Sequence, residues 1–226
     1  KLPANFPLPT YDLASNPVTE AGFALGKQLF YEKLLSRDTT INCASCHISY
    51  AAFSHPDHPT SHGIDNQFGR RNAPAVQNVL WKSSFFWDGG VFDLDLFSIA
   101  PIENPIEMDE KIGNVLAKLR ASKEYPSLFK KAYGSEDITT ERFLKALSQF
   151  MLTLVSANSK YDQFLAGKAQ LTADEAAGLQ LFKDKGCASC HSSILFTDHS
   201  FRSNGLLPEY NGDLGRYRIT ENVADK

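Results

Sequence analysis

The sequence contains no long hydrophobic run, no strong excess of either charge, and no cysteine outside two short motifs. Its longest strongly apolar stretch free of charge, ALSQFMLTLVSAN, is too short to span a bilayer. A net charge of −3 gives no indication of a nucleic-acid or anionic-membrane partner. The chemistry of the chain must therefore be sought in the few cysteine and histidine residues that it does have.

All four cysteines fall in two copies of the pentapeptide CASCH, at 43–47 and 187–191. A disulfide framework is not expected, because a chain of 226 residues with 42% hydrophobic residues has little need of such cross-links. A four-thiolate zinc site would use two C-x-x-C pairs, and a thioredoxin-like site would use one. Neither site explains the histidine that directly follows each pair.

Covalent haem explains the whole motif, because the two thiols add to the porphyrin vinyl groups and the adjacent histidine supplies the proximal iron ligand. Haem attachment is completed outside the cytoplasm, and the opening residues KLPANFPLPT lack the features of a signal peptide. We therefore expect a mature periplasmic chain whose leader has been removed. Two haem c groups are predicted, attached through Cys43, Cys46, Cys187 and Cys190, with His47 and His191 as iron ligands.

A second repeat precedes each motif. The stretch GKQLF at 26–30 aligns with GLQLF at 178–182, and each lies in an amphipathic segment that opens with threonine and an acidic residue. Cys43 follows Phe30 by thirteen positions, whereas Cys187 follows Phe182 by five. The repeated unit is therefore a helix followed by a haem-attachment motif.

Two further helices are predicted over 108–120 and 140–154 from apolar residues at helical spacing. No convincing alternating strand is found, and the stretches IAPIENPIEM and NAPAVQNVLWKSSFFWDGG are expected to be loops that join short helices. The predicted fold is mainly α, with two cytochrome c-like domains. The first is expected over residues 1–158 and the second over 159–226, the latter incomplete at its C-terminus.

The order of CASCH, GRRNAP, FFWDGG, PIENPIEM and the second CASCH resembles the bacterial di-haem cytochrome c peroxidase family, which also contains the di-haem enzymes that mature tryptophan tryptophylquinone. The resemblance implies reduction of hydrogen peroxide to water at the N-terminal haem. Electrons would arrive at the C-terminal haem from a small cytochrome c or a cupredoxin, and a homodimer is expected.

The same resemblance implies roles for three residues. Glu107 in NPIEM matches a distal-pocket glutamate that moves a proton during peroxide cleavage, and an apolar pocket is expected to raise its pKa. The alternative makes Glu107 an N-terminal residue of the 108–120 helix, where the helix dipole favours a negative charge, and both roles can hold at once. Trp87 matches a tryptophan between the two haems, whereas Trp81 is expected in the core. Asn72 matches a ligand of a calcium ion held between the domains.

The iron ligands opposite His47 and His191 are less clear from the sequence. Some relatives place a histidine on the peroxidatic iron in the resting enzyme, and His62 fits this role best, whereas His55 and His58 are expected to be solvated. The equivalent of Met108 is not a ligand in the family, and Met151 is expected to pack in the core. The sixth ligand of the second haem is expected in a later segment, with His199 as the alternative.

Phe97 departs from the family pattern, because many relatives have a glutamine ten residues before the glutamate. Peroxide binding as in those relatives therefore cannot be assumed. Three other functions stay open: a non-catalytic di-haem electron-transfer cytochrome, a di-haem oxidase that modifies a partner protein, and a zinc-binding structural protein.

Overall fold

The computed structural model describes residues 2–203, 205 and 212–225, and divides the chain into two compact units. The first unit comprises the described residues 10–154 and 212–225, and the second comprises 2–9, 155–203 and 205. The units differ from the domains expected over 1–158 and 159–226. Residues 2–9 cluster with the second unit, and residues 212–225 with the first.

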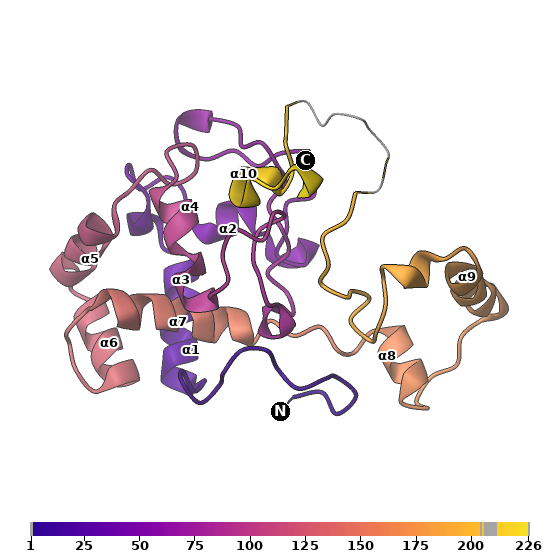
Figure 1. Ribbon diagram of the computed structural model, residues 1–226. Coiled ribbons are helices and arrows are strands. Elements are labelled where there is room, and N and C mark those ends of the chain that lie inside the picture. Colours follow the sequence, from indigo (N-terminus) through magenta and orange to yellow (C-terminus); the bar gives the residue numbers. More distant parts are fainter. Residues whose placement is uncertain (1, 204, 206–211, 226) are drawn as a thin grey trace. The chain divides into compact units, whose positions relative to one another are not determined.

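The first unit is built from helices and long connecting loops (Figure 1). Its α-helices are α1 (Glu20–Phe30), α2 (Cys43–Cys46), α3 (Leu94–Phe97), α4 (Ile99–Glu103), α5 (Ile112–Ala121), α6 (Tyr125–Tyr133), α7 (Thr140–Leu152) and α10 (Tyr217–Thr220). Its 3-10 helices are η1 (Lys33–Leu35), η2 (Ser49–Ala51), η3 (Ile64–Asn66), η4 (Val79–Trp81) and η6 (Val223–Asp225).

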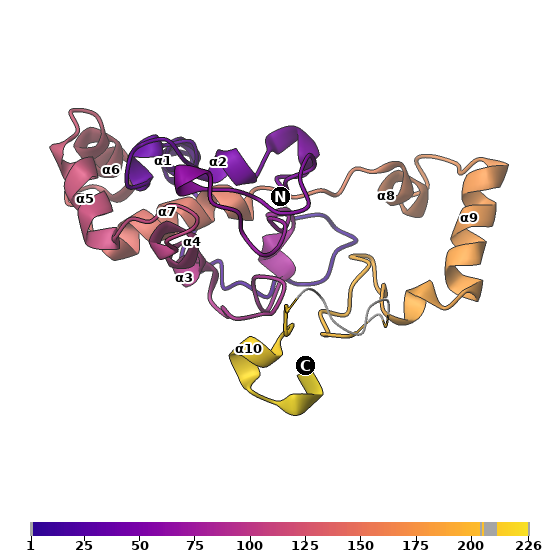
Figure 2. The same ribbon diagram turned by 90° about the horizontal axis from the view of Figure 1, so that it is seen from above.

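Helices α1 and α7 cross at the centre of this unit, as both ribbon views show (Figures 1 and 2). Each is capped by a threonine, since Thr19 accepts a hydrogen bond from the Gly22 amide and Thr139 does the same from Arg142. The two helices approach so closely that a Cβ at Gly26 would lie 1.9 Å from the Ala146 carbonyl oxygen. Glycine permits this approach because it has no side chain. The glycine of GKQLF therefore serves the packing of α1 on α7, a contact that the equivalent Gly178 does not make.

The predicted helix at 140–154 is confirmed as α7, but the helix predicted over 108–120 begins later, at Ile112. The reason is local. Asp109 has a left-handed φ of 47°, and the Glu107 and Asp109 amides both bond to the Asn104 carbonyl, so this segment forms a turn.

The second unit contains α8 (Lys160–Leu165), α9 (Ala173–Asp184) and the 3-10 helix η5 (Cys187–Ser189). Its helices open on capping boxes, in which Ser159 pairs with Asp162 and Thr172 with Glu175. None of the described side chains in this unit is buried, in contrast to the apolar core between α1 and α7.

The described residues form only isolated β-bridges, at Ile48–Ser54, His62–Phe68 and Phe85–Val91, and no sheet. The prediction of a mainly α fold is confirmed. Among the described residues, no helix combines the length and apolar character needed to cross a membrane.

Candidate haem site

The first CASCH motif forms one short helical turn. Asn42 caps α2 by accepting a hydrogen bond from the Ser45 amide, and Ser45 returns the contact to the Asn42 amide. His47 follows directly, with its ring Nδ1 2.9 Å from the Phe53 carbonyl oxygen. Burial lowers the pKa of His47, which favours the neutral imidazole that a metal requires. The Nδ1 contact leaves Nε2 as the nitrogen that can bind iron.

The second motif repeats the histidine contact in the second unit, although its 3-10 turn has no side-chain cap. His191 follows η5, and its Nδ1 lies 3.1 Å from the Phe196 carbonyl oxygen. Phe182, in the last turn of α9, has its ring centroid 6.5 Å from the centroid of the His191 ring. The Nδ1 contact with a backbone carbonyl therefore favours the same tautomer at both histidines.

Each histidine lies within one of two equivalent aromatic clusters. In each cluster, a phenylalanine in the last turn of the preceding helix packs edge-on against the phenylalanine whose carbonyl meets the histidine. The ring centroids are 6.0 Å apart at 79° in one cluster and 5.7 Å apart at 81° in the other. The clusters are Phe30, Phe53 and His47, and Phe182, Phe196 and His191. Sequence reasoning missed Phe53 and Phe196, although they follow their histidines by a similar six and five positions.

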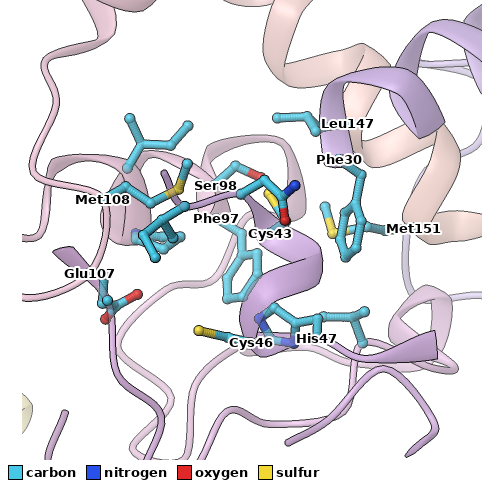
Figure 3. Close-up of a pocket in the computed structure, with 16 residues that line it drawn as sticks. Phe30, Cys43, Cys46, His47, Phe97, Ser98, Glu107, Met108, Leu147 and Met151 are labelled. Carbon is cyan, nitrogen blue, oxygen red and sulfur yellow. The ribbon is translucent and has the colours of Figure 1, made fainter. Parts of the chain in front are cut away.

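Two adjoining cavities surround the first motif. The smaller, about 50 Å³, is lined by Cys43, Cys46 and His47 together with mostly apolar side chains (Figure 3). The larger, about 750 Å³, also contains Cys46 and His47 in its wall and falls within the range of about 300–1,000 Å³ of known cofactor pockets. Tethering thiols, an available imidazole nitrogen and a cavity of this size fit a covalently bound haem.

Glu107 lines both cavities, and Figure 3 shows it at the same end of the pocket as Cys46 and His47. Burial raises the pKa of Glu107, although Asn104 partly opposes this by donating Nδ2 to Oε1 at 2.7 Å. Burial, and then the Glu107 charge, raise the pKa of the Cys46 thiol to about 11. The carboxylate is therefore within electrostatic reach of the attachment motif.

The backbone of Glu107 is fixed by the loop before η3. The Ile64 amide donates to the Glu107 carbonyl oxygen at 2.8 Å. A side chain at Gly63 would meet that oxygen at 2.2 Å, so only glycine permits this approach. The alternative role of Glu107 at a helix start does not hold, because Glu103 accepts the hydrogen bond from the Ile112 amide at 3.2 Å.

Trp87 and Asn72 are directly connected. The Trp87 indole Nε1 donates to the Asn72 carbonyl oxygen at 2.8 Å, while 59% of the Trp87 side chain stays exposed. The Asn72 Nδ2 donates to the carbonyl oxygens of His55 and His58, each at 2.8 Å. Asn72 therefore joins the tryptophan loop to the histidine-containing loop.

The rings of His55, His58 and His62 form a cluster with centroids 5.1–6.3 Å apart. His55 is buried, contrary to the expectation that it would be solvated, because it stacks on His58 and its carbonyl is bound by Asn72. His58 is exposed as expected. His62 does not line either cavity among the described residues, although its carbonyl oxygen lies 3.7 Å from the Cys46 sulfur.

Trp81 and Met151 lie in the core, as the sequence predicted. Met151 also lines the smaller cavity, as Met108 does. Phe97 lines both cavities, and its ring packs against Phe86 with centroids 4.8 Å apart. His199 lies in the second unit, where its amide bonds to the Thr197 hydroxyl.

Comparison with known proteins gives a consistent result. The family model described as di-haem cytochrome c peroxidase matches residues 20–170. Methylamine utilization protein MauG of Methylorubrum extorquens is 37% identical over 211 residues, covering 89% of this chain and 57% of that protein. Cytochrome c551 peroxidase of Nitrosomonas europaea is 38% identical over 207 residues, covering 89% of this chain and 61% of that protein.

The structural comparison agrees with the sequence comparison. A crystal structure of a MauG-like protein associated with microbial copper homeostasis superposes with a TM-score of 0.85 at 30% identity, over 99% of this chain and 71% of that one. The diheme peroxidase BthA from Burkholderia thailandensis shares the fold with a TM-score of 0.76 at 22% identity, over 93% of this chain and 63% of that one. The chain thus spans about three-fifths of the length of the curated relatives named above.

Proposed function

The chain belongs to the di-haem cytochrome c peroxidase family, and from this membership we propose that it forms the haem-binding part of a peroxidase that reduces hydrogen peroxide to water. Family membership implies haem c. When bound, haem iron supplies the redox centre at which the O–O bond accepts two electrons. The proposed attachment residues are Cys43, Cys46, Cys187 and Cys190, with His47 and His191 as iron ligands.

Glu107 is the proposed catalytic residue. Reduction of H₂O₂ consumes two protons and two electrons and yields two water molecules, so a group must deliver protons to the oxygen that leaves. The Glu107 carboxylate takes a proton from one peroxide oxygen and returns it to the other. The observation that carries this role is the position of Glu107 in the wall of both cavities, bound to Asn104 and with a raised pKa.

Trp87 is proposed to assist electron transfer from the haem that Cys187, Cys190 and His191 would hold to the haem that Cys43, Cys46 and His47 would hold. The exposed Trp87 ring and its hydrogen bond to the Asn72 carbonyl support a fixed orientation for this residue. A small cytochrome c or a cupredoxin is the proposed donor, and hydrogen peroxide the oxidant. The names of the peroxidase relatives are consistent with such a donor.

Further proposals concern the resting enzyme and its setting. A calcium ion would bind Asn72 through Oδ1, because its Nδ2 is engaged by two carbonyl oxygens. His62 is proposed as a resting iron ligand, which requires its loop to move from the arrangement described, where the ring packs against His58 and Phe68. The full-length protein is proposed to be a periplasmic homodimer.

The decisive experiment is Glu107→Gln in protein produced by a host that attaches haem c. The substitution keeps the shape of the side chain, so both haems should still be attached, while peroxide turnover falls about 10²–10⁴-fold. Glu103→Gln is the matched control, since that carboxylate caps α5 rather than lining a cavity. Near-normal turnover in Glu107→Gln would remove this residue from the mechanism.

The raised pKa of Glu107 adds a second readout. A carboxylate must be ionised to accept the first proton, so wild-type turnover should fall as the pH decreases through this raised pKa. The residual turnover of Glu107→Gln should lack that acid limb. An identical limb in both proteins would assign it to another group.

A di-haem oxidase that modifies a partner protein is the second candidate, because relatives carrying the MauG name are as similar as those named peroxidases. Steady-state oxidation of a reduced small cytochrome c by peroxide favours the peroxidase. Peroxide reactivity without donor turnover favours the oxidase. Haems that stay low-spin in every redox state and do not react with peroxide favour a simple electron carrier.

A further inference from the structure

Part of the wall of the larger cavity comes from the segment 212–220, which follows the second CASCH motif in the chain. Asp213, Arg218 and Ile219 line this cavity together with Cys46 and Glu107. A segment that lies beyond the second haem motif in sequence thus contributes to the site around the first.

Arg71 holds this segment in place. Its guanidinium forms a two-pronged contact with Asp213, from Nε at 2.5 Å and from Nη2 at 2.6 Å. Its Nη1 donates to Asp88 at 2.7 Å, and Nη2 also reaches the Gly215 carbonyl oxygen at 3.2 Å. The three charged side chains are only 19–24% exposed, so solvent screens this network less than it screens a surface ion pair.

A second set of contacts ties α10 to the FFWDGG turn. Arg216 donates Nη1 to the Asp88 carbonyl oxygen at 2.7 Å. Ile219 packs so close to Gly90 that a side chain there would come within 3.1 Å of it. The segment 212–220 is therefore held at Asp88, through Arg71 and Arg216, and at Gly90, through Ile219. Both positions follow Trp87 in the FFWDGG turn.

The charges in the two cavities are unevenly distributed. The smaller cavity has no lysine or arginine among the described residues that line it, whereas the larger contains Arg70, Arg71 and Arg218. Arg71 is already matched by the carboxylates of Asp88 and Asp213. The positive charges that can pair with a bound anionic group are therefore those of Arg70 and Arg218.

Arg218 is the better oriented of these two cations. Its Nη2 donates to the Gly212 carbonyl oxygen at 2.8 Å, and its Nε lies 4.0 Å from Asp213. Its side chain is 34% exposed, so it is partly withdrawn from solvent at the cavity wall. Asp213 thus links the orientation of Arg218 to the pair that it forms with Arg71.

We propose that Arg218, positioned by the Arg71–Asp213 pair, binds a propionate carboxylate of the haem attached at the first motif. In haem, the carbons that form thioether bonds and the two propionates lie on opposite edges of the ring. A porphyrin tethered at Cys46 therefore needs cationic partners elsewhere in the cavity wall, and guanidinium groups suit carboxylates. The proposal rests on the haem attachment proposed above, but it does not depend on peroxidase activity.

The test is the reduction potential of each haem in Arg218→Gln. A cation beside haem stabilises the reduced, less positive state, so its removal should shift the potential of the first haem downwards and leave that of the second unchanged. Arg142→Gln is the matched control, because Arg142 pairs with Asp137 and lines neither cavity, so both potentials should stay unchanged. Arg218→Lys retains the charge and should shift the first potential less than Arg218→Gln does.

An unchanged first potential in Arg218→Gln, or equal shifts at both haems, would overturn the proposal. Haem absorbance measured beforehand separates this result from failed attachment, and the potentials can be measured whether or not the protein turns over peroxide.

Asp213→Asn tests the positioning step separately. Removal of a negative charge by itself should raise the potential of the first haem, whereas a displaced Arg218 should lower it. A downward shift supports positioning by Asp213, and a rise or no change contradicts it.

Discussion

The substitution Gly63→Ala tests how the chain positions Glu107 without altering any polar group. A Cβ at residue 63 would lie 2.2 Å from the Glu107 carbonyl oxygen and 2.5 Å from its Cα. Because real contacts of this kind stay beyond 3.0 Å, the Glu107 backbone has to withdraw by about 0.8 Å. The hydrogen bond from the Ile64 amide, 2.8 Å long in the native structure, is then stretched or lost.

The expected consequences follow from that displacement. Overpacking costs about 1–3 kcal/mol in the free energy of unfolding, and loss of one backbone hydrogen bond costs about 1 kcal/mol. A misplacement of about 1 Å in catalytic geometry can reduce turnover about 10²-fold. The Gly63→Ala variant should therefore have a lower free energy of unfolding and a slower peroxide turnover, while both haems stay attached.

Denaturant unfolding and steady-state peroxide reduction measure the two effects. Gly113→Ala is the control, because Gly113 lies inside α5 with nothing within 4 Å of the added methyl group. That variant should gain up to about 1 kcal/mol from helix propensity and keep full turnover. Wild-type turnover in Gly63→Ala would refute the reasoning that the 63–64 loop fixes Glu107.

Two further predictions concern stability. Gly26→Ala should lower the free energy of unfolding by about 1–3 kcal/mol or more, because its methyl group would meet the Ala146 carbonyl oxygen at 1.9 Å. The control is Gly178→Ala at the equivalent position, where the added methyl group has nothing within 4 Å. That variant should be neutral or slightly stabilising in the same denaturant assay. Burial would raise the pKa of Glu110, but hydrogen bonds led by the one from Lys118 lower this pKa overall. The ionised Glu110 therefore stabilises the folded protein at a pH above its unfolded pKa. This stabilisation is lost as the pH falls through the folded pKa. Glu110→Gln should therefore flatten the acid side of the plot of melting temperature against pH, and an unchanged acid side would contradict this.

Helices α1, α7 and α9 and the attachment motifs could be predicted because their signals are local. Apolar residues at helical spacing predicted α7, and threonine caps marked the starts of α1 and α9. The CASCH spacing predicted haem because the chemistry of two thioethers and one iron ligand requires adjacent residues. Each of these signals is complete within a few turns of chain.

The rest of the candidate site depends on contacts between distant residues, which leave no periodic signal. Arg71 and Asp213 are 142 positions apart, and nothing in either local sequence indicates their pairing. The burial of His55 depends on Asn72, 17 positions away, and the late start of α5 depends on the turn made by Asn104. The sequence shows Gly63 only as a glycine in a polar loop. Its role depends on the backbone of Glu107, which packs against it and is distant in the sequence.

Mass spectrometry of proteolytic peptides, from protein produced in a host that attaches haem c, tests the central claim most directly. The account predicts that the peptide containing residues 43–47 and the peptide containing residues 187–191 each carry the mass of one haem after denaturation. A preparation in which either peptide is unmodified, or in which a chelatable metal ion replaces the haem, would contradict it.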